Sequence, residues 1–159
     1  MRRKKQLLTE EESVAILEKM TSGVLAVLGD DDYPYAVPIS YIYHEGKIYF
    51  HSALAGHKID AISRHNKVSF CVIEKDEIVP EKFTTHFRSV IAFGKADFID
   101  DEAEKMKAIE LLARKYSPLQ SEEELRHEIE KGFKHMNVIR LCIEHLTGKE
   151  AIELVRARL

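Results

Sequence analysis

The stretch "FTTHFRSVIAFGKADFI", residues 83–99, indicates one long β-strand, because aromatic and β-branched residues recur along it between polar ones. An interior glycine often marks a β-bulge, so we expect this strand to bend at Gly94. We expect its core-facing side to be the one that carries Phe83, Thr85, Phe87, Ser89, Ile91 and Phe93. Ser89 interrupts this apolar face, and Arg88 lies beside it. Such local breaks in a pattern often mark functional positions, so both residues become candidates for a site.

Five further segments indicate strands, and short turns join most of them. These segments are residues 23–30, 35–44, 47–52, 67–74 and 137–146. The turn "HEGK", residues 44–47, is a hairpin signal. Short connections imply antiparallel pairing, and six such strands with alternating faces close most easily into a small barrel. The sequence therefore predicts a mainly β fold with flanking helices, a six-stranded antiparallel β-barrel formed as one domain by residues 1–159.

Helices are expected around and between these strands. Thr9 and Glu12 have the spacing of a capping box, and Gly23 is expected to close the helix that they begin. Ser121 and Glu124 repeat the same spacing later in the chain. The other expected helices are residues 56–65, residues 100–116 and a short one at residues 147–159, while residues 75–82 are expected to form a loop.

The composition disfavours several classes of protein. With 32% charged residues and a net charge of −3, the chain lacks the basic footprint of a nucleic-acid-binding protein. No apolar stretch approaches the ~20 residues of a membrane span, and the basic start "MRRKK" leads into a capped helix rather than an apolar run. Cys71 and Cys142 lie in separate strands without C-x-x-C spacing, which is typical of buried thiols in a reducing compartment. We therefore expect a cytoplasmic protein.

Common motifs of catalysis and metal binding are missing from the sequence. Its eight histidines include no H-E-x-x-H pair and no set with cysteines at zinc spacing. The G-x-S-x-G elbow, the Walker loop and the dinucleotide glycine fingerprint are missing too. The sequence therefore predicts no bound metal and no nucleophilic residue.

The segment "IYFHSALAGHK", residues 48–58, is the first candidate for ligand binding. It changes from strand residues to small residues and then starts a helix at Gly56. The first turn of a helix presents free N–H groups, which favour phosphate, and Ser52, His57 and Lys58 can add a hydroxyl and positive charge. The alternative interpretation is a helix start with a surface lysine.

Two more segments point to the same kind of ligand. Pro34 and Pro38 interrupt a strand, so backbone groups at Val37, Ile39 and Ser40 become available to a flat heteroaromatic ring. The alternative is an ordinary edge strand protected by proline. Arg88 suits phosphate, although it could instead pair with a surface carboxylate. Together the three segments suggest a phosphorylated, partly flat ligand lying against a small barrel.

At this point the sequence resembles the flavin-binding split-barrel proteins related to pyridoxamine 5′-phosphate oxidase, and most closely their nitroimidazole-resistance-like branch. Four stretches carry the resemblance in order: "YPYAVPISYIY", "GKIYFHSALAGHKID", "FRSVIAFGKA" and "EHLTGKEA". The resemblance implies a split barrel that forms a homodimer and binds flavin mononucleotide (FMN) in two equivalent grooves at the subunit interface.

The same resemblance assigns roles to individual residues. The strand with Val37, Pro38, Ile39 and Ser40 would lie along the isoalloxazine ring. The ring edge, ribityl chain and phosphate would meet His51, Ser52, His57 and Lys58. One of the two subunits would complete each site with Arg88, Ser89 and Val90, and Lys149 would approach it. His51 matches a histidine beside the flavin in the resistance branch and is the candidate catalytic residue, orienting substrate or passing a proton.

Departures from the family pattern argue against a true vitamin B6 oxidase. His57 stands where those oxidases usually carry arginine, and Ser89 stands where they usually carry glutamine. The end of the chain that would bind a substrate phosphate through arginine is not recognisable. The resemblance therefore favours an FMN-dependent oxidoreductase that acts on a small electrophile in a nitroreductase-like way. The alternatives are a non-catalytic flavin or haem module and, more weakly, pyridoxamine 5′-phosphate oxidase.

Overall fold

A single antiparallel sheet dominates the computed structural model, which describes residues 4–158. The strand order is β2-β1-β5-β6-β7-β4-β3. The strands are β1 (Ser22–Leu28), β2 (Pro34–Ser40), β3 (Ile42–His44), β4 (Lys47–Ser52), β5 (Lys67–Val79), β6 (Thr84–Phe98) and β7 (Asn137–Glu150). The predicted mainly β, antiparallel split-barrel class is confirmed.

The sheet has seven strands rather than the expected six, because Tyr41 divides the segment 35–44 into β2 and β3. These two strands lie at opposite ends of the strand order, yet a single residue joins them. The sheet must therefore curl back toward itself at Tyr41. The Tyr41 side chain is fully buried, packs edge-on against Phe70, and donates its hydroxyl to the carbonyl of Leu17 at 2.9 Å.

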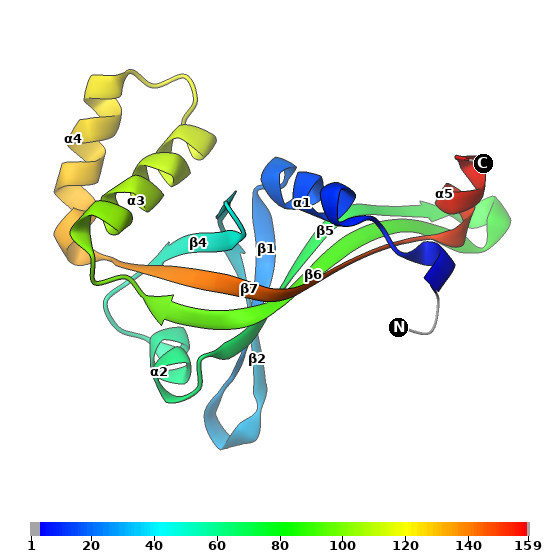
Figure 1. Ribbon diagram of the computed structural model, residues 1–159, viewed down its shortest axis with the longest axis horizontal. Helices are drawn as coiled ribbons and strands as arrows, with labels where there is room; N and C mark the ends of the chain where they lie inside the picture. Colours follow the sequence, from blue (N-terminus) through cyan, green and yellow to red (C-terminus); the bar gives the residue numbers. More distant parts are fainter. Residues whose placement is uncertain (1–3, 159) are drawn as a thin grey trace.

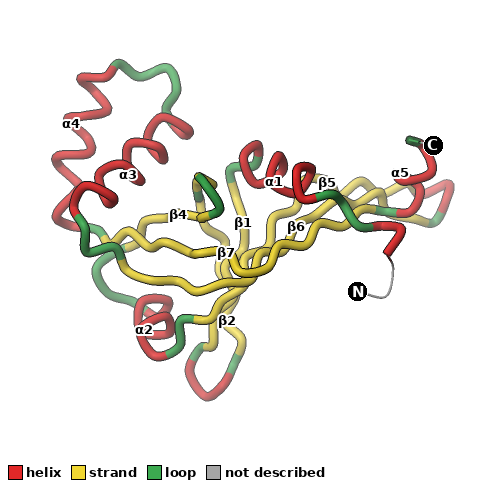
Figure 2. The backbone as a smooth tube through the Cα atoms, in the orientation of Figure 1, coloured by secondary structure: helices red, strands yellow, loops and turns green. Residues whose placement is uncertain are grey.

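Helices flank the sheet (Figures 1 and 2). They are α1 (Glu10–Lys19), α2 (His57–Arg64), α3 (Glu102–Tyr116), α4 (Glu122–Gly132) and α5 (Ile152–Ala157). Helices α3 and α4 stand side by side at one end of the molecule, while the long β5–β6 hairpin runs to the other end beside α5 (Figure 1). The expected capping boxes form at both Thr9–Glu12 and Ser121–Glu124. No helix among residues 4–158 combines the length and the apolarity needed to cross a membrane.

The face of β6 that points to the core is the opposite of the one expected. Val90 and Ala92 are fully buried, whereas Ile91 and Phe93 are 36% and 45% exposed. Phe83 lies outside the strand in a left-handed conformation and is 98% exposed. The prediction was wrong because both faces of this strand carry apolar residues, and alternation alone does not say which of them turns inward.

The pairing irregularity expected at Gly94 is present. The register of β6 with β7 shifts between Phe93 and Gly94, where Phe93 pairs with His145 and Gly94 with Ile143, so the extra residue, Glu144, belongs to β7. A Cβ atom on Gly94 would lie 1.9 Å from the carbonyl oxygen of Cys142, so the two backbones meet more closely than any side chain would allow.

Several boundaries differ from the expectation. Gly23 lies within β1 and does not close α1, which ends at Lys19. The expected loop 75–82 is strand as far as Val79, because pairing with β6 continues to the hairpin turn. Residues 147–150 belong to β7, and the last helix begins only at Ile152. The two cysteines are free but only partly buried.

Candidate functional site

The end of β4 and the start of α2 bring Ser52 and Lys58 together. The Lys58 ammonium donates to the Ser52 hydroxyl at 2.7 Å. Gly56 is the N-cap residue of α2, with a φ of 140° and no side chain that caps the helix. The first N–H groups of α2, at His57 and Lys58, therefore lack an intrahelical partner. A cation, a hydroxyl and free amides at one helix start form a donor set suited to an anion.

His57 is held in place from two sides. Its Nδ1 atom lies 3.3 Å from a carboxylate oxygen of Asp30, and its ring packs edge-on against Tyr35 with centroids 4.5 Å apart. Asp30 also accepts from Arg64 at 2.6 Å, and this hydrogen bond lowers the pKa of the Asp30 carboxyl. The imidazole is therefore oriented by a carboxylate that is ionised at neutral pH.

Strand β2 splits the four ring-binding candidates between its two faces. Val37 and Ile39 are half-buried and pack against the core, whereas Pro38 and Ser40 are exposed. Within the described residues β2 pairs only with β1, so its other edge is open. Pro38 has no N–H to donate to β1, which is consistent with a position facing that open edge.

Ser40 and His51 line a common cavity of about 660 Å³. They come from β2 and β4, and the rest of the wall is built largely by α3 and α4. The helical lining includes Ile109, Leu112, Tyr116, His127 and Ile129, and Gln120 lies in the loop between the two helices. Sequence reasoning assigned none of these residues to the site. The available signal was the position of two amphipathic helices inserted between the last two strands.

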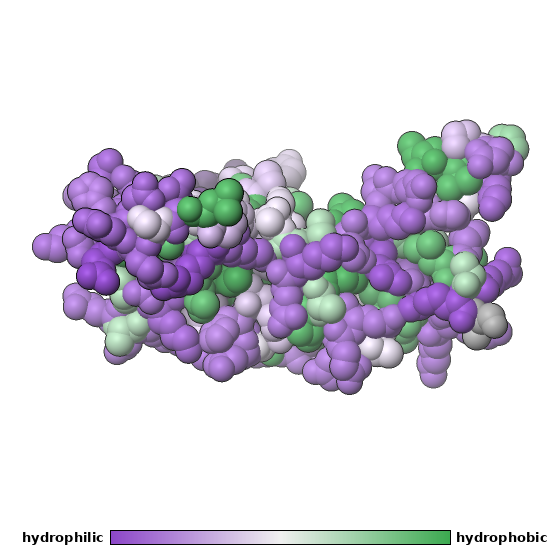
Figure 3. Space-filling view, turned by 90° about the horizontal axis from the view of Figure 1, so that it is seen from above, coloured by the Kyte–Doolittle hydropathy of each residue, from purple (hydrophilic) through white to green (hydrophobic). Residues whose placement is uncertain are grey.

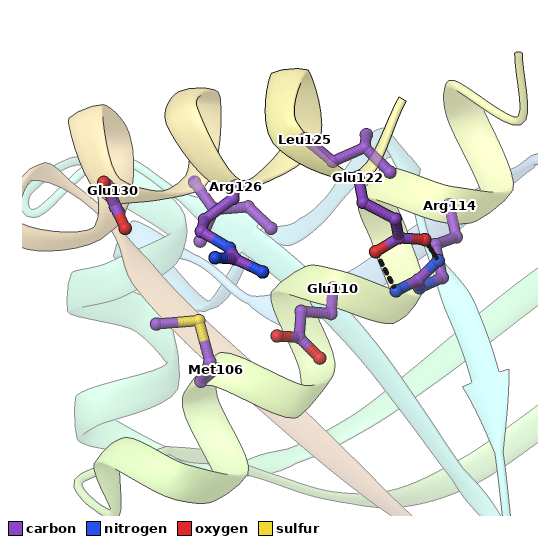
Figure 4. A pocket seen from close by; sticks show the side chains of 8 residues that line it. Met106, Glu110, Arg114, Glu122, Leu125, Arg126 and Glu130 are labelled. Carbon is purple, nitrogen blue, oxygen red and sulfur yellow. Dashed lines mark hydrogen bonds and ion pairs between the residues drawn. The ribbon is translucent and has the colours of Figure 1, made fainter. Parts of the chain in front are cut away.

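The α3–α4 hairpin that covers this cavity is tied together by an ion pair. The Arg114 guanidinium of α3 and the Glu122 carboxylate of α4 face each other in a two-point contact, one arm of which measures 2.7 Å (Figure 4). This pair borders a second, smaller pocket of about 270 Å³ between the helices. None of the candidate site residues lines that second pocket.

Arg88 lies in a different part of the molecule and is already paired. Its guanidinium donates to Glu150 at 2.8 and 3.2 Å and to Glu74 at 3.4 Å. Glu150 is fully buried and also contacts Arg158. The sequence left open whether Arg88 binds phosphate or pairs with a surface carboxylate. The structure shows a pair with a carboxylate, although this carboxylate, that of Glu150, is buried rather than on the surface.

Near Arg88 lie the remaining candidate site residues from the second half of the chain, Ser89, Val90 and Lys149. Ser89 and Lys149 are directly paired across β6 and β7, and the Lys149 ammonium lies 5.6 Å from the centre of the Phe87 ring. The Val90 side chain is fully buried, so only its backbone could meet a ligand. Lys149 is eleven residues further along β7 than Val138, the register partner of His51, so at ~3.3 Å per residue the strand separates Lys149 from His51 by up to roughly 35 Å. Within one chain these residues do not form a single site with His51.

An apolar outer face runs across β1, β5 and β6. Along each strand, the residues of this face alternate with buried ones. Across the strands they are register neighbours: Val24 pairs with Cys71, and Cys71 pairs with Ile91. The exposed members are Leu28, Ile73, Ile91 and Phe93. Further apolar surface gathers where β5 and β6 turn near α5, visible at the right of Figure 3, and this hairpin end exposes Ile78 and Phe83.

Among the described residues, no three His, Cys, Asp or Glu side chains are grouped so that they could hold a metal ion.

The architecture places the chain in a class of antiparallel barrels with a ligand-sized cavity beside the barrel wall. More specifically, the chain belongs to the pyridoxamine 5′-phosphate oxidase family, whose model matches residues 9–150. No curated protein matches the sequence.

Solved structures share the fold at low sequence identity. A proposed 5-nitroimidazole antibiotic resistance protein from Bacteroides thetaiotaomicron has a TM-score of 0.73 and 23% identity, over 91% of this chain and 86% of that one. A conserved hypothetical protein from Mycobacterium tuberculosis has a TM-score of 0.80 and 17% identity, over 93% and 88%. An FAD- and haem-binding protein from Mycobacterium smegmatis has a TM-score of 0.70 and 18% identity, over 97% and 80%.

Proposed function

We propose that this protein binds FMN and acts as an FMN-dependent oxidoreductase on a small electrophilic substrate. The observation that carries the proposal is the anion-binding donor set at Ser52, Lys58 and the start of α2. His57, the first residue of α2, packs against Tyr35 of β2, and the other edge of β2 is open within the described residues and could take a flat ring. Membership of a family named for an oxidase that acts on a phosphorylated vitamer supports the same conclusion.

The residues present fit the phosphate of FMN. Lys58 and Ser52 already share a hydrogen bond of 2.7 Å, and an incoming phosphate could accept from both. Gly56 leaves open space at the helix start, since no atom lies within 4 Å of where its Cβ would be. When bound, FMN supplies hydride or one-electron chemistry, while the protein supplies position and electrostatics.

His51 is the residue proposed to act on the substrate. It lines the cavity together with Ser40, at the border between the β2 edge and the α3–α4 hairpin. A histidine can donate or accept a proton at either ring nitrogen, so at this border it can orient a substrate or pass a proton to it.

The proposal includes a homodimer with the flavin at the subunit interface. Arg88, Ser89, Val90 and Lys149 lie far from His51 along β7, so they can complete its site only from a second copy of the chain. The exposed apolar face around Ile91 and Phe93 provides a surface that such a copy could cover. Ser89 and Lys149 are better placed than Arg88 to meet the ligand, since Arg88 is engaged with Glu150.

A spectrum of the purified protein tests the cofactor assignment. The protein should be yellow, with the absorption near ~450 nm expected of oxidised flavin, and mass analysis of the released ligand should give FMN. A colourless protein that takes up no FMN on reconstitution would contradict the proposal.

Replacing the phosphate-binding cation tests the position of the ligand. Lys58→Ala should weaken the binding of FMN by roughly 1–3 kcal/mol, as expected for a lost hydrogen bond to a charged group. Fluorescence titration of the flavin measures the change. Lys82→Ala, at the exposed turn between β5 and β6, is the matched control and should leave the affinity unchanged.

A second candidate function is a binding or sensor module for flavin or haem, which the FAD- and haem-binding relative of similar fold favours. Anaerobic mixing with a nicotinamide cofactor separates the two functions. Bleaching of the flavin, followed by its reoxidation when an electrophile is added, supports the oxidoreductase. A flavin that stays oxidised supports the module.

A further inference from the structure

The cavity between the barrel and the α3–α4 hairpin has the size and composition of a small-molecule pocket. Its volume of about 660 Å³ lies within the range of roughly 300–1,000 Å³ that is usual for such sites. Ser40 and His51 belong to its wall, so it opens onto the side chains proposed above to meet the flavin and the substrate.

The hairpin makes one wall of the cavity apolar. Ile109 and Leu112 of α3 and Ile129 of α4 are all buried there, and Leu125 and Met136 extend the same surface. The neutral polar groups are fewer, and they include Tyr116 and Gln120. Such a wall favours an apolar ligand, because removing apolar surface from water is worth about 25 cal/mol per Å².

Apart from two histidines, the ionisable side chains that line the cavity and are charged at neutral pH are all negative. Glu124 and Glu128 line it, and among its described lining residues there is neither lysine nor arginine. Glu124 accepts from the backbone N–H and the hydroxyl of Ser121, both at 2.8 Å, and the backbone bond lowers the pKa of its carboxyl. Lys131 of α4 lies outside the lining, with its ammonium 3.7 Å from the Glu128 carboxylate. An anionic ligand would therefore meet the Glu124 carboxylate and no lysine or arginine of the lining.

The nearest cations on α3 are engaged elsewhere. Lys115 donates to the carbonyl of Met20 at 2.5 Å and lies 4.6 Å above the Tyr41 ring. Arg114 is held by Glu122 on the side of the smaller pocket (Figure 4). Neither side chain is free to turn toward an anion in the cavity.

From this arrangement we propose that the cavity is the substrate pocket and selects apolar molecules that are neutral or positively charged. Phosphorylated and carboxylated compounds, which include the phosphorylated B6 vitamers, are then poor substrates. The substrate role rests on the proposed FMN-dependent function, since it places the substrate beside His51. The charge selectivity follows from the cavity walls alone.

Three probes of one shape and different charge test the selectivity. Naphthylmethanol, naphthoate and naphthylmethylammonium of the same ring isomer are titrated calorimetrically into the flavin-loaded and the flavin-free protein, at a pH above the usual range of histidine titration. We expect the neutral and cationic probes to bind at least about tenfold more tightly than naphthoate. Equal affinities for all three would overturn the proposal.

Charge reversal on one helix supplies the matched variants. Glu128→Lys, on the cavity side of α4, should strengthen naphthoate binding by up to about fivefold and weaken the cationic probe, as expected for an exposed charge, since the Glu128 side chain is 70% exposed. Glu130→Lys lies two residues away on the side of the smaller pocket and should change neither affinity (Figure 4). Identical effects of the two variants would show that the probes bind elsewhere.

The two proposals fail in different ways. Absence of flavin uptake removes the FMN-dependent function and the substrate role, while the probes still report the selectivity of the cavity in the flavin-free protein. Flavin uptake that abolishes binding of all three probes would show that the cavity belongs to the flavin site, which overturns the substrate pocket alone.

Discussion

At the scale of single residues, Glu150 is a buried carboxylate with two arginine partners. It is fully buried, and its two oxygens are shared between Arg88 and Arg158. Removing one partner of a buried ion pair leaves the other charge without compensation, which is strongly destabilising. Arg88 therefore has a structural role whether or not it also meets a ligand.

Glu150→Gln should lower the free energy of unfolding by about 2–4 kcal/mol. This is less than the roughly 3–5 kcal/mol of a fully buried pair, because both arginines are partly exposed. Urea denaturation measures the loss. Glu144→Gln, whose pair with Lys95 is exposed at 3.7 Å, is the control and should cost at most about 1 kcal/mol. Equal losses in the two variants would contradict a special role for Glu150.

At the scale of elements, α1 and α4 begin in the same way. In each helix a Ser or Thr accepts from the N–H group of a glutamate three residues later, and that glutamate accepts from the N-cap backbone. The backbone hydrogen bonds lower the pKa of Glu12 and of Glu124 below the usual carboxyl value. The ionised carboxylates therefore stabilise both helix starts.

The lowered pKa of Glu124 predicts that acid destabilises the α3–α4 hairpin. A carboxyl with a lowered native pKa contributes stability above its unfolded pKa, and this contribution is lost as the pH falls through the native pKa. Thermal unfolding followed by circular dichroism should show a falling midpoint below the ordinary carboxyl pKa of about 4.3. Glu124→Gln should be less stable than the wild type at neutral pH and show a shallower acid dependence. A variant with an unchanged pH profile would refute the contribution of this cap.

At the scale of the whole molecule, the outward side of the barrel is the unusual feature. Ile73, Ile91 and Phe93 are large apolar residues that remain exposed on neighbouring strands. Contiguous apolar surface of this kind commonly marks a protein interface. Ser89 and its register partner Lys149 lie on the same side of the sheet as Ile91, so a second chain that covered this face would also meet them.

A charge on this face should prevent dimer formation. Ile91→Glu buries a carboxylate in the proposed interface, which is costly without a partner, so we expect monomers and at least about tenfold weaker FMN binding. Sedimentation equilibrium measures the mass, and flavin titration measures the affinity. Leu119→Glu, at a position 96% exposed between α3 and α4, should remain dimeric. A wild-type protein that is monomeric at high concentration would contradict the homodimer.

Much of the local structure could be predicted from the sequence. The two capping boxes and the start of α2 beside Gly56 form as expected, and a register shift occurs at Gly94. The caps and the helix start depend on residues close together in the chain, and the close approach at Gly94 depends on the missing Cβ of one glycine. The family could be predicted as well, because its motifs occur in order along the chain. Part of the site could be predicted too, since Ser52 and Lys58, which share a hydrogen bond, are only six residues apart in the chain.

The tertiary structure decided what depends on distant residues. Val90 rather than Ile91 turns inward because the curvature of the whole sheet selects between two apolar faces. Arg88 is committed to Glu150, which is 62 residues away in the chain, and the cavity around His51 exists only where α3 and α4 fold over the barrel. The sequence by itself thus determined the elements and the family, through short-range hydrogen bonds and patterns. Packing between distant segments determined which surfaces are buried, which charges are paired and where a substrate can lie.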